Sequence, residues 1–234
     1  MAFRAALIVG AGAGLSAALA RRLAAAGTKV ALAARNIEKL APLAHEVGAL
    51  ALPCNAAEPA EVACLFAELD RRDLVPDCVI YNASARERGP IAELDPARVA
   101  QTIAVSAFGG FLVGQQAARR MLAGGGGAIG FTGASASVKG YALSAPFAMG
   151  KFALRGLAQS MARELHPQGI HIVHLVIDGG IRSPGRGETA DAPDRLPDRL
   201  LDPAAIAETY LHALEQPRSA WSLEVELRPW IERF

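Results

Sequence analysis

Three glycines near the start of the chain have a spacing suited to binding an anion. Gly10, Gly12 and Gly14 follow an apolar run, Ala5–Val9, and precede an Ala/Leu-rich segment that ends at Gly27. Gly10 permits a tight turn, and the other two let backbone N–H groups approach a phosphate closely. The N-terminus of the following helix adds the positive end of its dipole. This strand–turn–helix context predicts a site for the pyrophosphate of a dinucleotide.

Arg35 stands at the end of the next apolar run, Val30–Ala34, where no acidic residue is present. An acidic side chain there would hydrogen-bond the ribose of NAD and repel the 2′-phosphate of NADP. A guanidinium instead holds a phosphate through paired, charge-assisted hydrogen bonds. We therefore expect the dinucleotide to be NADP, with NAD as the alternative.

Strands and helices alternate along the chain, and they must position these residues. The alternation predicts an α/β fold, a three-layer doubly wound parallel sheet (Rossmann fold) of about seven strands, in one domain over residues 1–234. The Gly109-Gly110 pair is expected to interrupt the helix at 99–122, and Asn36 to cap the helix at 36–47. Strands are expected at 5–9, 30–34, 49–52, 78–81, 128–132, 170–177 and 221–227, and helices after Gly14 and at 36–47, 58–72, 99–122, 147–166 and 203–215.

The loops at one edge of this sheet are expected to form the binding site. Doubly wound sheets bind ligands at the carboxyl ends of their strands. The long loop 178–202 is rich in Pro, Gly, Arg and Asp, and we expect it to cover the substrate as a lid. Its arginines and acidic residues balance, so its charge does not identify the substrate. The loops expected at this edge are 10–16, 34–36, 82–86, 132–146 and 178–202.

The composition argues against several other classes of protein. A net charge of +1 disfavours nucleic acid or an anionic membrane as the partner. The three cysteines lack metal-binding spacing, and their odd number is typical of reduced cytoplasmic thiols. No uninterrupted apolar run is long enough to span a bilayer. His171 and His174 would point to opposite faces of a strand, so we expect no metal site.

Four degenerate motifs in the right order make the chain resemble the short-chain dehydrogenase/reductase family over nearly its whole length. The family's T-G-x-x-x-G-[IL]-G appears as V-G-A-G-A-G-L-S at 9–16, and its N-N-A-G as Y-N-A-S at 81–84. Its Y-x-x-x-K appears as F-A-M-G-K at 147–151, and its P-G-x-[VI]-x-T as D-G-G-I-R-S at 178–183. The resemblance implies the same fold, a nicotinamide dinucleotide, and a homodimer or homotetramer formed through the helices at 99–122 and 147–166.

The motif positions also imply which residues hold the cofactor. Asn55 stands where the family has an adenine-facing aspartate, and its side-chain oxygen still accepts a hydrogen bond. Ser16 replaces a glycine, and its added hydroxymethyl is expected either to push the first helix outwards or to bond a phosphate oxygen. The cofactor residues expected are Gly10, Gly12, Gly14, Leu15, Arg35, Asn55, Asn82, Lys151, Ile181 and Ser183.

The catalytic positions implied by the resemblance are only partly retained. Phe147 occupies the position of the family's tyrosine, and it has no oxygen to act as a general acid or base. The family's serine falls on Ala134, beside Ser135, and its asparagine falls on Ser106. Lys151 is kept. The chain is thus identified as a divergent member of the family, with Phe in place of the catalytic Tyr.

Two functions remain open on this sequence. In the first, the chain is an NADP(H)-dependent oxidoreductase that acts on a small carbonyl, alcohol or activated double bond with a relocated proton donor. In the second, it binds NADP without turnover, as a sensor or scaffold. The candidate proton donors are Tyr141, Ser135, Ser137, Ser144, Asp178 and Lys151 itself.

Overall fold

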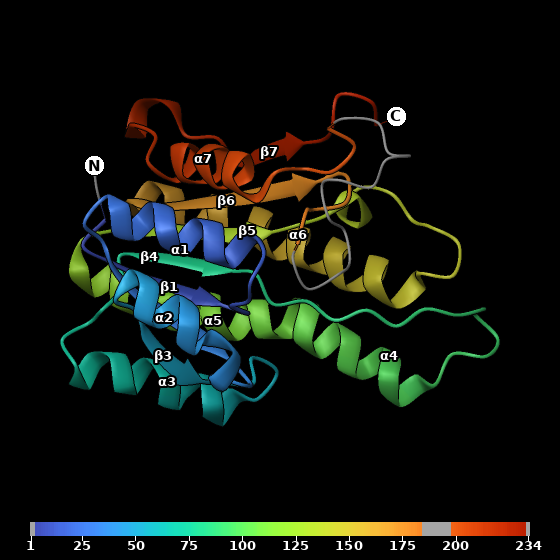
Figure 1. The fold of residues 1–234 in the computed structure, drawn as a ribbon, viewed down its shortest axis with the longest axis horizontal. Helices are drawn as coiled ribbons and strands as arrows, with labels where there is room; N and C mark the ends of the chain where they lie inside the picture. The colour runs from blue at the N-terminus through green and yellow to red at the C-terminus, as the bar shows by residue number, and fades with distance from the viewer. Residues whose placement is uncertain (1–2, 184–197, 233–234) are drawn as a thin grey trace.

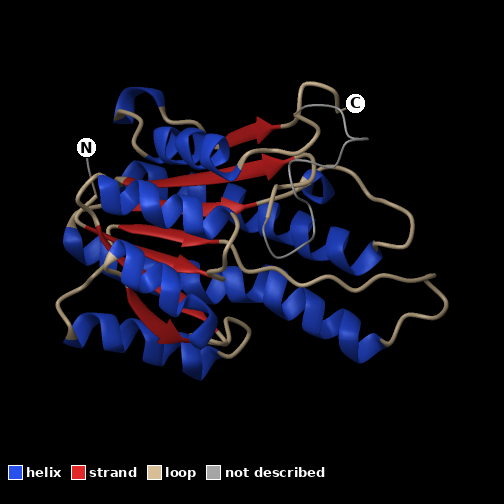
Figure 2. Cartoon of the chain, viewed as in Figure 1, coloured by secondary structure: helices blue, strands red, loops and turns tan. Residues whose placement is uncertain are grey.

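A computed structural model describes residues 3–183 and 198–232 of the chain, and Figure 1 shows its fold. Within these ranges seven strands form one sheet in the order β3-β2-β1-β4-β5-β6-β7, and every neighbouring pair is parallel. The arrows in Figure 2 accordingly run in one direction. The predicted doubly wound α/β fold is confirmed. The strands are β1 (Ala5–Val9), β2 (Lys29–Ala34), β3 (Leu50–Pro53), β4 (Cys78–Tyr81), β5 (Gly127–Thr132), β6 (Ile170–Ile177) and β7 (Glu224–Leu227).

Helices cover both faces of the sheet. On one face α1, α2 and α7 contribute buried side chains to a single apolar cluster, and on the other face α3, α5 and α6 do the same. Strands buried on both faces read as unbroken apolar runs, which is why β1 and β4 are recognisable in the sequence. The fully buried β6 is mainly apolar but includes His171 and His174. The helices are α1 (Leu15–Ala25), α2 (Ala41–Val47), α3 (Pro59–Arg71), α4 (Pro96–Ile103), α5 (Gly109–Gly124), α6 (Ala145–Leu165) and α7 (Pro203–Leu214).

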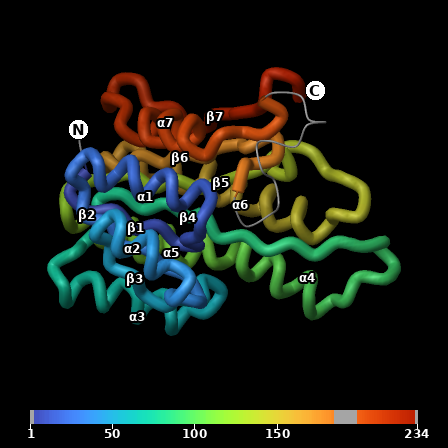
Figure 3. Tube along the Cα trace, viewed as in Figure 1, coloured from blue at the N-terminus to red at the C-terminus, as the bar shows by residue number. Residues whose placement is uncertain are grey.

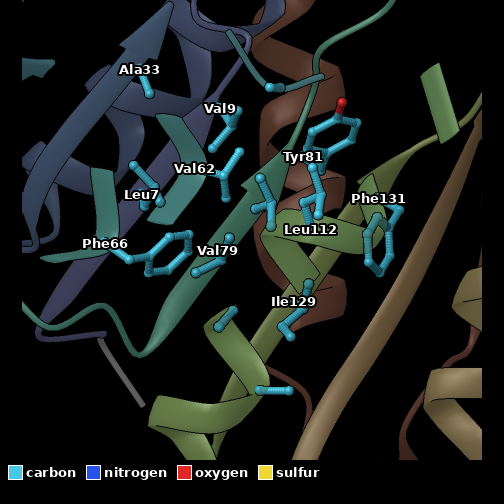
Figure 4. Packing of buried hydrophobic residues seen from close by; sticks show 14 of the residues in the cluster. Leu7, Val9, Ala33, Val62, Phe66, Val79, Tyr81, Leu112, Ile129 and Phe131 are labelled. Carbon is cyan, nitrogen blue, oxygen red and sulfur yellow. The ribbon is translucent and has the colours of Figure 1, made fainter. Parts of the chain in front are cut away.

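Alternate residues of each strand fill the two halves of the core. Leu7 and Val9 of β1 face the cluster formed with α3, α5 and α6, whereas Ala6 and Ile8 face the opposite cluster. Figure 4 shows part of the first cluster, in which Phe66 lies beside Leu7 and Val79. This packing fixes the strand ends, and therefore the loops at the edge of the sheet.

The long helix is not interrupted at its paired glycines, so that expectation was wrong. The chain stays helical from α4 through a π-helical segment, Ala104–Phe108, into α5. A Cβ atom on Gly109 would overlap the hydroxyl of Tyr81, and one on Gly110 would lie 2.5 Å from Cδ1 of Leu154. The glycines therefore allow this helix to approach β4 and α6 closely rather than ending it.

The helix Pro96–Gly124 is, in the described part of the chain, the one helix that is long and apolar enough to cross a membrane by length and composition. A core helix of a soluble protein passes the same test. Here one side of the helix packs on the sheet through Leu112, Val113 and Met121, which are buried in the core. This side of the helix is therefore part of the core of the Rossmann-type fold.

Several boundaries differ from the predicted ones by a few residues. The first turn after Asn36 is a 3-10 turn, Glu38–Leu40, and the side-chain oxygen of Asn36 accepts the Glu38 N–H at 3.0 Å. The last strand begins at Glu224 rather than at Trp221, whose ring stacks on His171 at 4.5 Å between centroids.

The expected lid, 178–202, lies only partly within the described residues. Residues 184–197 are outside them, while Ile181 and Leu201 on either side form an isolated parallel bridge. In Figure 3 the segment after β4, helix α4 and the segment leading into α6 all extend beyond the carboxyl ends of the strands. These segments form the walls of the site.

Candidate active site

One large cleft, of about 1370 Å³, opens at the carboxyl ends of the strands. Its lining comes from the turn after β1, the segment after β4, the start of α6 and the segment after β6. All of the residues expected to bind cofactor line it: Gly10, Gly12, Gly14, Leu15, Arg35, Asn55, Asn82, Lys151, Ile181 and Ser183. Phe147, Ser135 and Tyr141 line it as well, whereas Ser106 does not.

The glycine turn has the shape of an anion cradle. Gly10 has a φ of +82°, and a Cβ atom there would overlap the backbone of Ala83. An added Cβ on Gly12 would meet nothing within 4 Å, so this part of the turn is open to the cleft. No side chain caps α1 after Gly14, and its first turn carries no acidic residue. The turn thus fits the pyrophosphate that the sequence predicts.

Ser16 lines the cleft beside the glycine turn, and its hydroxyl is engaged in hydrogen bonds within the fold. It is only 1% exposed. Its hydroxyl donates to the carbonyl oxygen of Gly10 at 3.2 Å and accepts from the side-chain nitrogen of Asn82 at 2.7 Å. The hydroxyl therefore joins the glycine turn to the segment that leaves β4.

Two cationic side chains line a second cavity beyond the glycine turn. A smaller cavity of about 330 Å³ there is lined by Arg35 and Lys39, and its described lining includes no acidic residue. Lys39 is not among the residues predicted from the sequence. It lies in the 3-10 turn Glu38–Leu40, whereas Arg35 directly follows β2, so no regular spacing in the sequence connects the two.

The adenine-side residue Asn55 is engaged in local hydrogen bonds. Its side-chain oxygen accepts from the backbone of Ala57 at 3.3 Å, and its own backbone N–H donates to Glu61 at 2.7 Å. This arrangement fixes the start of α3 and leaves Asn55 on the wall of the cleft.

Lys151 is a buried cation at the floor of the cleft. Its side chain comes from α6, is 3% exposed, and donates from Nζ to the carbonyl oxygen of Thr132 at 2.7 Å. Burial, and to a smaller extent the positive charge of Arg86, lower the pKa of Lys151 to about 7. The amine is thus poised to exchange a proton near neutral pH.

The ring of Phe147 lies between two cations. The guanidinium carbon of Arg86 is 4.3 Å from the ring centroid, and Nζ of Lys151 is 5.8 Å from it. Both distances are within the range of cation–π attraction. Arg86, in the segment after β4, also lines the cleft, and it is not among the residues predicted from the sequence. Its place is set by the path of that segment, for which the local sequence offers no signal.

The polar candidates for proton transfer have different surroundings. Ser106 is fully buried, and its hydroxyl bonds the backbone of Ala85. Ser137 is fully buried too, and it accepts from the backbone of Ala134 at 3.2 Å. The structure therefore does not bring these two serines to the cleft. Ser135 and Ser144 do line it.

Tyr141 and Asp178 are linked through Lys139. Nζ of Lys139 is 3.3 Å from the Asp178 carboxylate and 5.8 Å from the centroid of the Tyr141 ring. Hydrogen bonds with Tyr141 and then with Asp178 raise the pKa of Lys139. Arg228 lies 3.7 Å from the same carboxylate. Asp178 is therefore held among cations on the wall of the cleft.

The two histidines of β6 have separate neighbours. His171 stacks on Trp221, while Nδ1 of His174 lies 2.9 Å from the carboxylate of Glu224. Burial lowers the pKa of both imidazoles. Each histidine is thus part of the packing against the segment around β7.

Comparisons with known proteins assign the family. A model of the short chain dehydrogenase family matches residues 4–193. A sorbitol dehydrogenase of Cereibacter sphaeroides is 31% identical over 180 residues, which cover 74% of this chain and 70% of the relative. A short-chain dehydrogenase structure from Rhodopseudomonas palustris is 37% identical, with a TM-score of 0.79 over 96% of this chain and 99% of the other. A metagenomic short-chain oxidoreductase solved in complex with NADP is 25% identical, with a TM-score of 0.83 over 98% of both chains. The chain belongs to the short-chain dehydrogenase family of NAD(P)-dependent oxidoreductases.

Proposed function

We propose that this chain uses NADP(H) to reduce a small carbonyl compound or an activated double bond, or to oxidise the corresponding alcohol. The observation that carries the proposal is a single cleft lined by both the glycine turn and the buried ammonium of Lys151. A dinucleotide cradle and a cation able to exchange a proton are the two parts that hydride transfer to a carbonyl requires.

The cationic pair beyond the glycine turn supports NADP over NAD. Arg35 and Lys39 line the adjoining cavity, where a 2′-phosphate would find two positive charges. The metagenomic relative was solved in complex with NADP, which agrees with this choice. Gly10, Gly12 and Gly14 would hold the pyrophosphate, and Asn55, Asn82, Ile181 and Ser183 would line the rest of the cofactor site.

When bound, NADPH supplies a hydride to the carbonyl carbon. Lys151 then gives a proton from Nζ to the carbonyl oxygen, so that the product is a neutral alcohol, and the free amine regains a proton from solvent. The pKa of about 7 supports this role, because a general acid works best when its pKa lies near the working pH.

Lys151 is favoured over the other candidates by their surroundings. Phe147 has no ionisable group, and the Asp178 carboxylate is already paired with two cations, Lys139 and Arg228. Tyr141 and Ser135 line the cleft, yet no charge beside Ser135 activates its hydroxyl within the described interactions, and Tyr141 lies beside Lys139. Lys151 alone among the candidates combines burial, a place on the floor of the cleft and a neutral pKa.

The assembly implied by the family resemblance has support in an exposed apolar face. Phe108 stacks on Phe111 at 6.0 Å between centroids, and both rings are partly exposed on the long helix. Met149 and Phe152 are exposed on α6. We propose that this face joins copies of the chain into a homodimer or homotetramer in the cytoplasm.

Two measurements on the full chain test the function. NADPH binding is followed by its fluorescence, and hydride transfer is followed in stopped flow against a panel of small aldehydes, ketones and activated alkenes. We expect hydride transfer in the wild type, and at least a hundredfold slower transfer in Lys151→Met with NADPH still bound. NADPH binding with no transfer to any member of the panel would contradict the oxidoreductase and favour the sensor or scaffold.

A further inference from the structure

His174 is a buried titratable side chain to which the proposed reaction gives no role. It lies on β6, which runs between β5 and β7 in the sheet (Figure 1), and it is 1% exposed. Its Nδ1 lies 2.9 Å from the carboxylate of Glu224. Its other nitrogen, Nε2, has no hydrogen-bond partner among the residues that the structure describes. A buried nitrogen without a partner costs stability, so its position calls for a physical reason.

An arginine one helical turn after Lys151 fixes the orientation of this imidazole. Arg155 of α6 binds the Glu224 carboxylate through two hydrogen bonds of 2.7 Å each. The paired carboxylate accepts from His174 and cannot donate to it, so Nδ1 carries the proton and Nε2 keeps its lone pair. Burial lowers the pKa of His174, and the charges of Lys151 and Arg155 also lower it, against the opposing effect of Glu224. The ring is therefore neutral near pH 7.

The edge of the ring that carries Nε2 lies against the floor of the cleft. A Cβ atom added to Gly133 would overlap Nε2 of His174 and would lie 2.7 Å from its Cε1. Gly133 lines the cleft and directly follows Thr132, whose carbonyl oxygen holds Nζ of Lys151 at 2.7 Å. The N–H of Gly133 donates to the carbonyl oxygen of Leu175 at 2.6 Å. One peptide group thus binds β6 through its N–H and Lys151 through its carbonyl oxygen, and the imidazole lies against it.

We propose that His174 is a positioning residue for Lys151, a role that rests on the function proposed above, in which Lys151 donates the proton. The ring supports Gly133 and so keeps the carbonyl of Thr132 where it accepts a hydrogen bond from the ammonium. Because the ring is neutral, it adds no positive charge beside the buried cation. The lone pair of Nε2 is the negative end of the imidazole dipole, and its direction towards this floor favours a cation there.

The charged groups that act on this pair of side chains come from three elements. Glu224 of β7 and Arg155 of α6 act on His174, and Arg86, in the segment after β4, acts on Lys151. Loss of the imidazole leaves all of these charges in place, and Glu224 keeps its pair with Arg155. A change in the titration of Lys151 would therefore report the loss of support from the ring. Since the backbone hydrogen bond stabilises the ammonium, its weakening should lower the pKa of Lys151.

Nuclear magnetic resonance of the lysine side chains tests this role without any turnover. The chain has four lysines, so labelling the lysine ε-carbon with carbon-13 gives few signals, and Lys151→Met identifies the signal of Lys151. We expect this signal to titrate near pH 7 in the wild type. His174→Leu removes both ring nitrogens and should lower the midpoint by about half a unit or more. Gly133→Ala displaces the ring from the side of the cleft, and we expect a shift in the same direction.

His171 supplies the matched control on the same strand. It is buried like His174, but its ring stacks on Trp221 and bonds backbone carbonyls on the opposite face of the sheet. His171→Leu should therefore lose stability in urea and leave the midpoint of Lys151 unchanged. An unchanged midpoint in folded samples of His174→Leu or Gly133→Ala would overturn the positioning role. Equal shifts in the two histidine variants would also overturn it, because they would report a general loosening of the sheet.

The pH dependence of hydride transfer separates this role from the proposed function. In stopped flow with bound NADPH, the rate should fall as pH rises through the Lys151 midpoint. This profile should move to lower pH in His174→Leu but not in His171→Leu, with NADPH binding alike in both. Hydride transfer with one and the same pH profile in all proteins overturns the role of His174 and keeps the reductase. If no carbonyl compound is reduced by any of them, the proposed function fails, and the resonance titration still decides for or against His174.

Discussion

The side-chain nitrogen of Asn82 lies 2.7 Å from the hydroxyl of Ser16, which itself lies 3.2 Å from the carbonyl oxygen of Gly10. The first residue belongs to the segment after β4, and the other two belong to the glycine turn and to α1. The backbone N–H of Asn82 also donates to the carbonyl of Val9 at 2.8 Å. Asn82 thus joins the two segments that form the floor of the cofactor cleft.

Removing the Ser16 hydroxyl should weaken both the fold and the cradle. Ser16→Ala leaves the Asn82 amide and the Gly10 carbonyl without this partner in a buried place, which costs about 1–3 kcal/mol of unfolding free energy. We expect lower stability in urea and weaker NADPH binding. In a double-mutant cycle Ser16→Ala and Asn82→Ala should be non-additive, because both remove the same bond. Additive losses would show that the hydrogen bond contributes nothing.

Alanine at two of the turn glycines should separate folding from binding. At Gly10 the positive φ and the overlap with Ala83 predict a loss of several kcal/mol of stability. At Gly12 the added methyl group meets nothing, so Gly12→Ala should keep the wild-type melting temperature. It should nevertheless weaken NADPH binding, because the methyl group occupies space next to the proposed pyrophosphate. Unchanged NADPH binding by Gly12→Ala would place the pyrophosphate elsewhere.

The strands could be predicted because their apolar pattern is local in the sequence. Several site residues could not be predicted, because contacts between distant segments determine their positions. The apolar runs at 5–9 and 78–81, and the mainly apolar segment 170–177, match β1, β4 and β6 residue for residue. By contrast, the glycine pair at 109–110 predicts a break in the helix when only the sequence is considered. In the structure the pair lies against Tyr81 and Leu154, and the helix continues through it. Contacts between distant segments decide such positions, and no window of sequence contains them.

The residues of the candidate site could likewise be predicted only where their positions follow from the local sequence. The glycine turn and Arg35 follow their strands directly, so strand–turn–helix order was enough to select them. Arg86 and Lys39 reach the cleft through the path of an irregular segment and of a 3-10 turn. Ser16 was selected, but its partner Asn82 lies 66 positions away and its direction could not be inferred.

Loss of the cationic pair should change the choice of cofactor. Arg35→Ala and Lys39→Ala each remove a charge that lines the proposed 2′-phosphate cavity. We expect each to weaken NADPH binding roughly tenfold or more while leaving NADH binding nearly unchanged. Lys29→Ala, at the opposite end of β2, is the control and should change neither. Equal losses for NADPH and NADH, measured by fluorescence titration, would contradict a phosphate site.

A charge on the exposed apolar face should separate the copies of the chain. Phe111→Asp places a carboxylate beside Phe108 on α5, in the proposed interface. We expect light scattering after gel filtration to show a species near the chain mass of 24.4 kDa in place of the wild-type assembly. Val75→Asp, on an exposed turn before β4, should leave the assembly intact. A monomeric wild type would contradict the interface outright.

Lys151 should make stability depend on pH above neutrality. Its pKa is about 7 in the folded chain and near 10.5 in the unfolded chain, so the unfolded chain binds more protons between these values. The unfolding free energy should therefore rise with pH from 7 upwards, by up to about 1.4 kcal/mol per unit.

The useful window for this measurement is pH 7 to 8.5. Below pH 7 the two buried histidines, whose pKa values are lowered, bind protons more readily in the unfolded chain. They therefore add their own rise of unfolding free energy with pH, which would mask that of Lys151. Above the window Cys54 and Cys78, whose thiol pKa values are raised by burial, oppose the trend because the unfolded chain loses their protons first. Urea unfolding across the window should show the rise in the wild type and a flat profile in Lys151→Met. The same slope in both proteins would mean that the buried amine is not the group that titrates, and it would remove the physical basis for Lys151 as the proton donor.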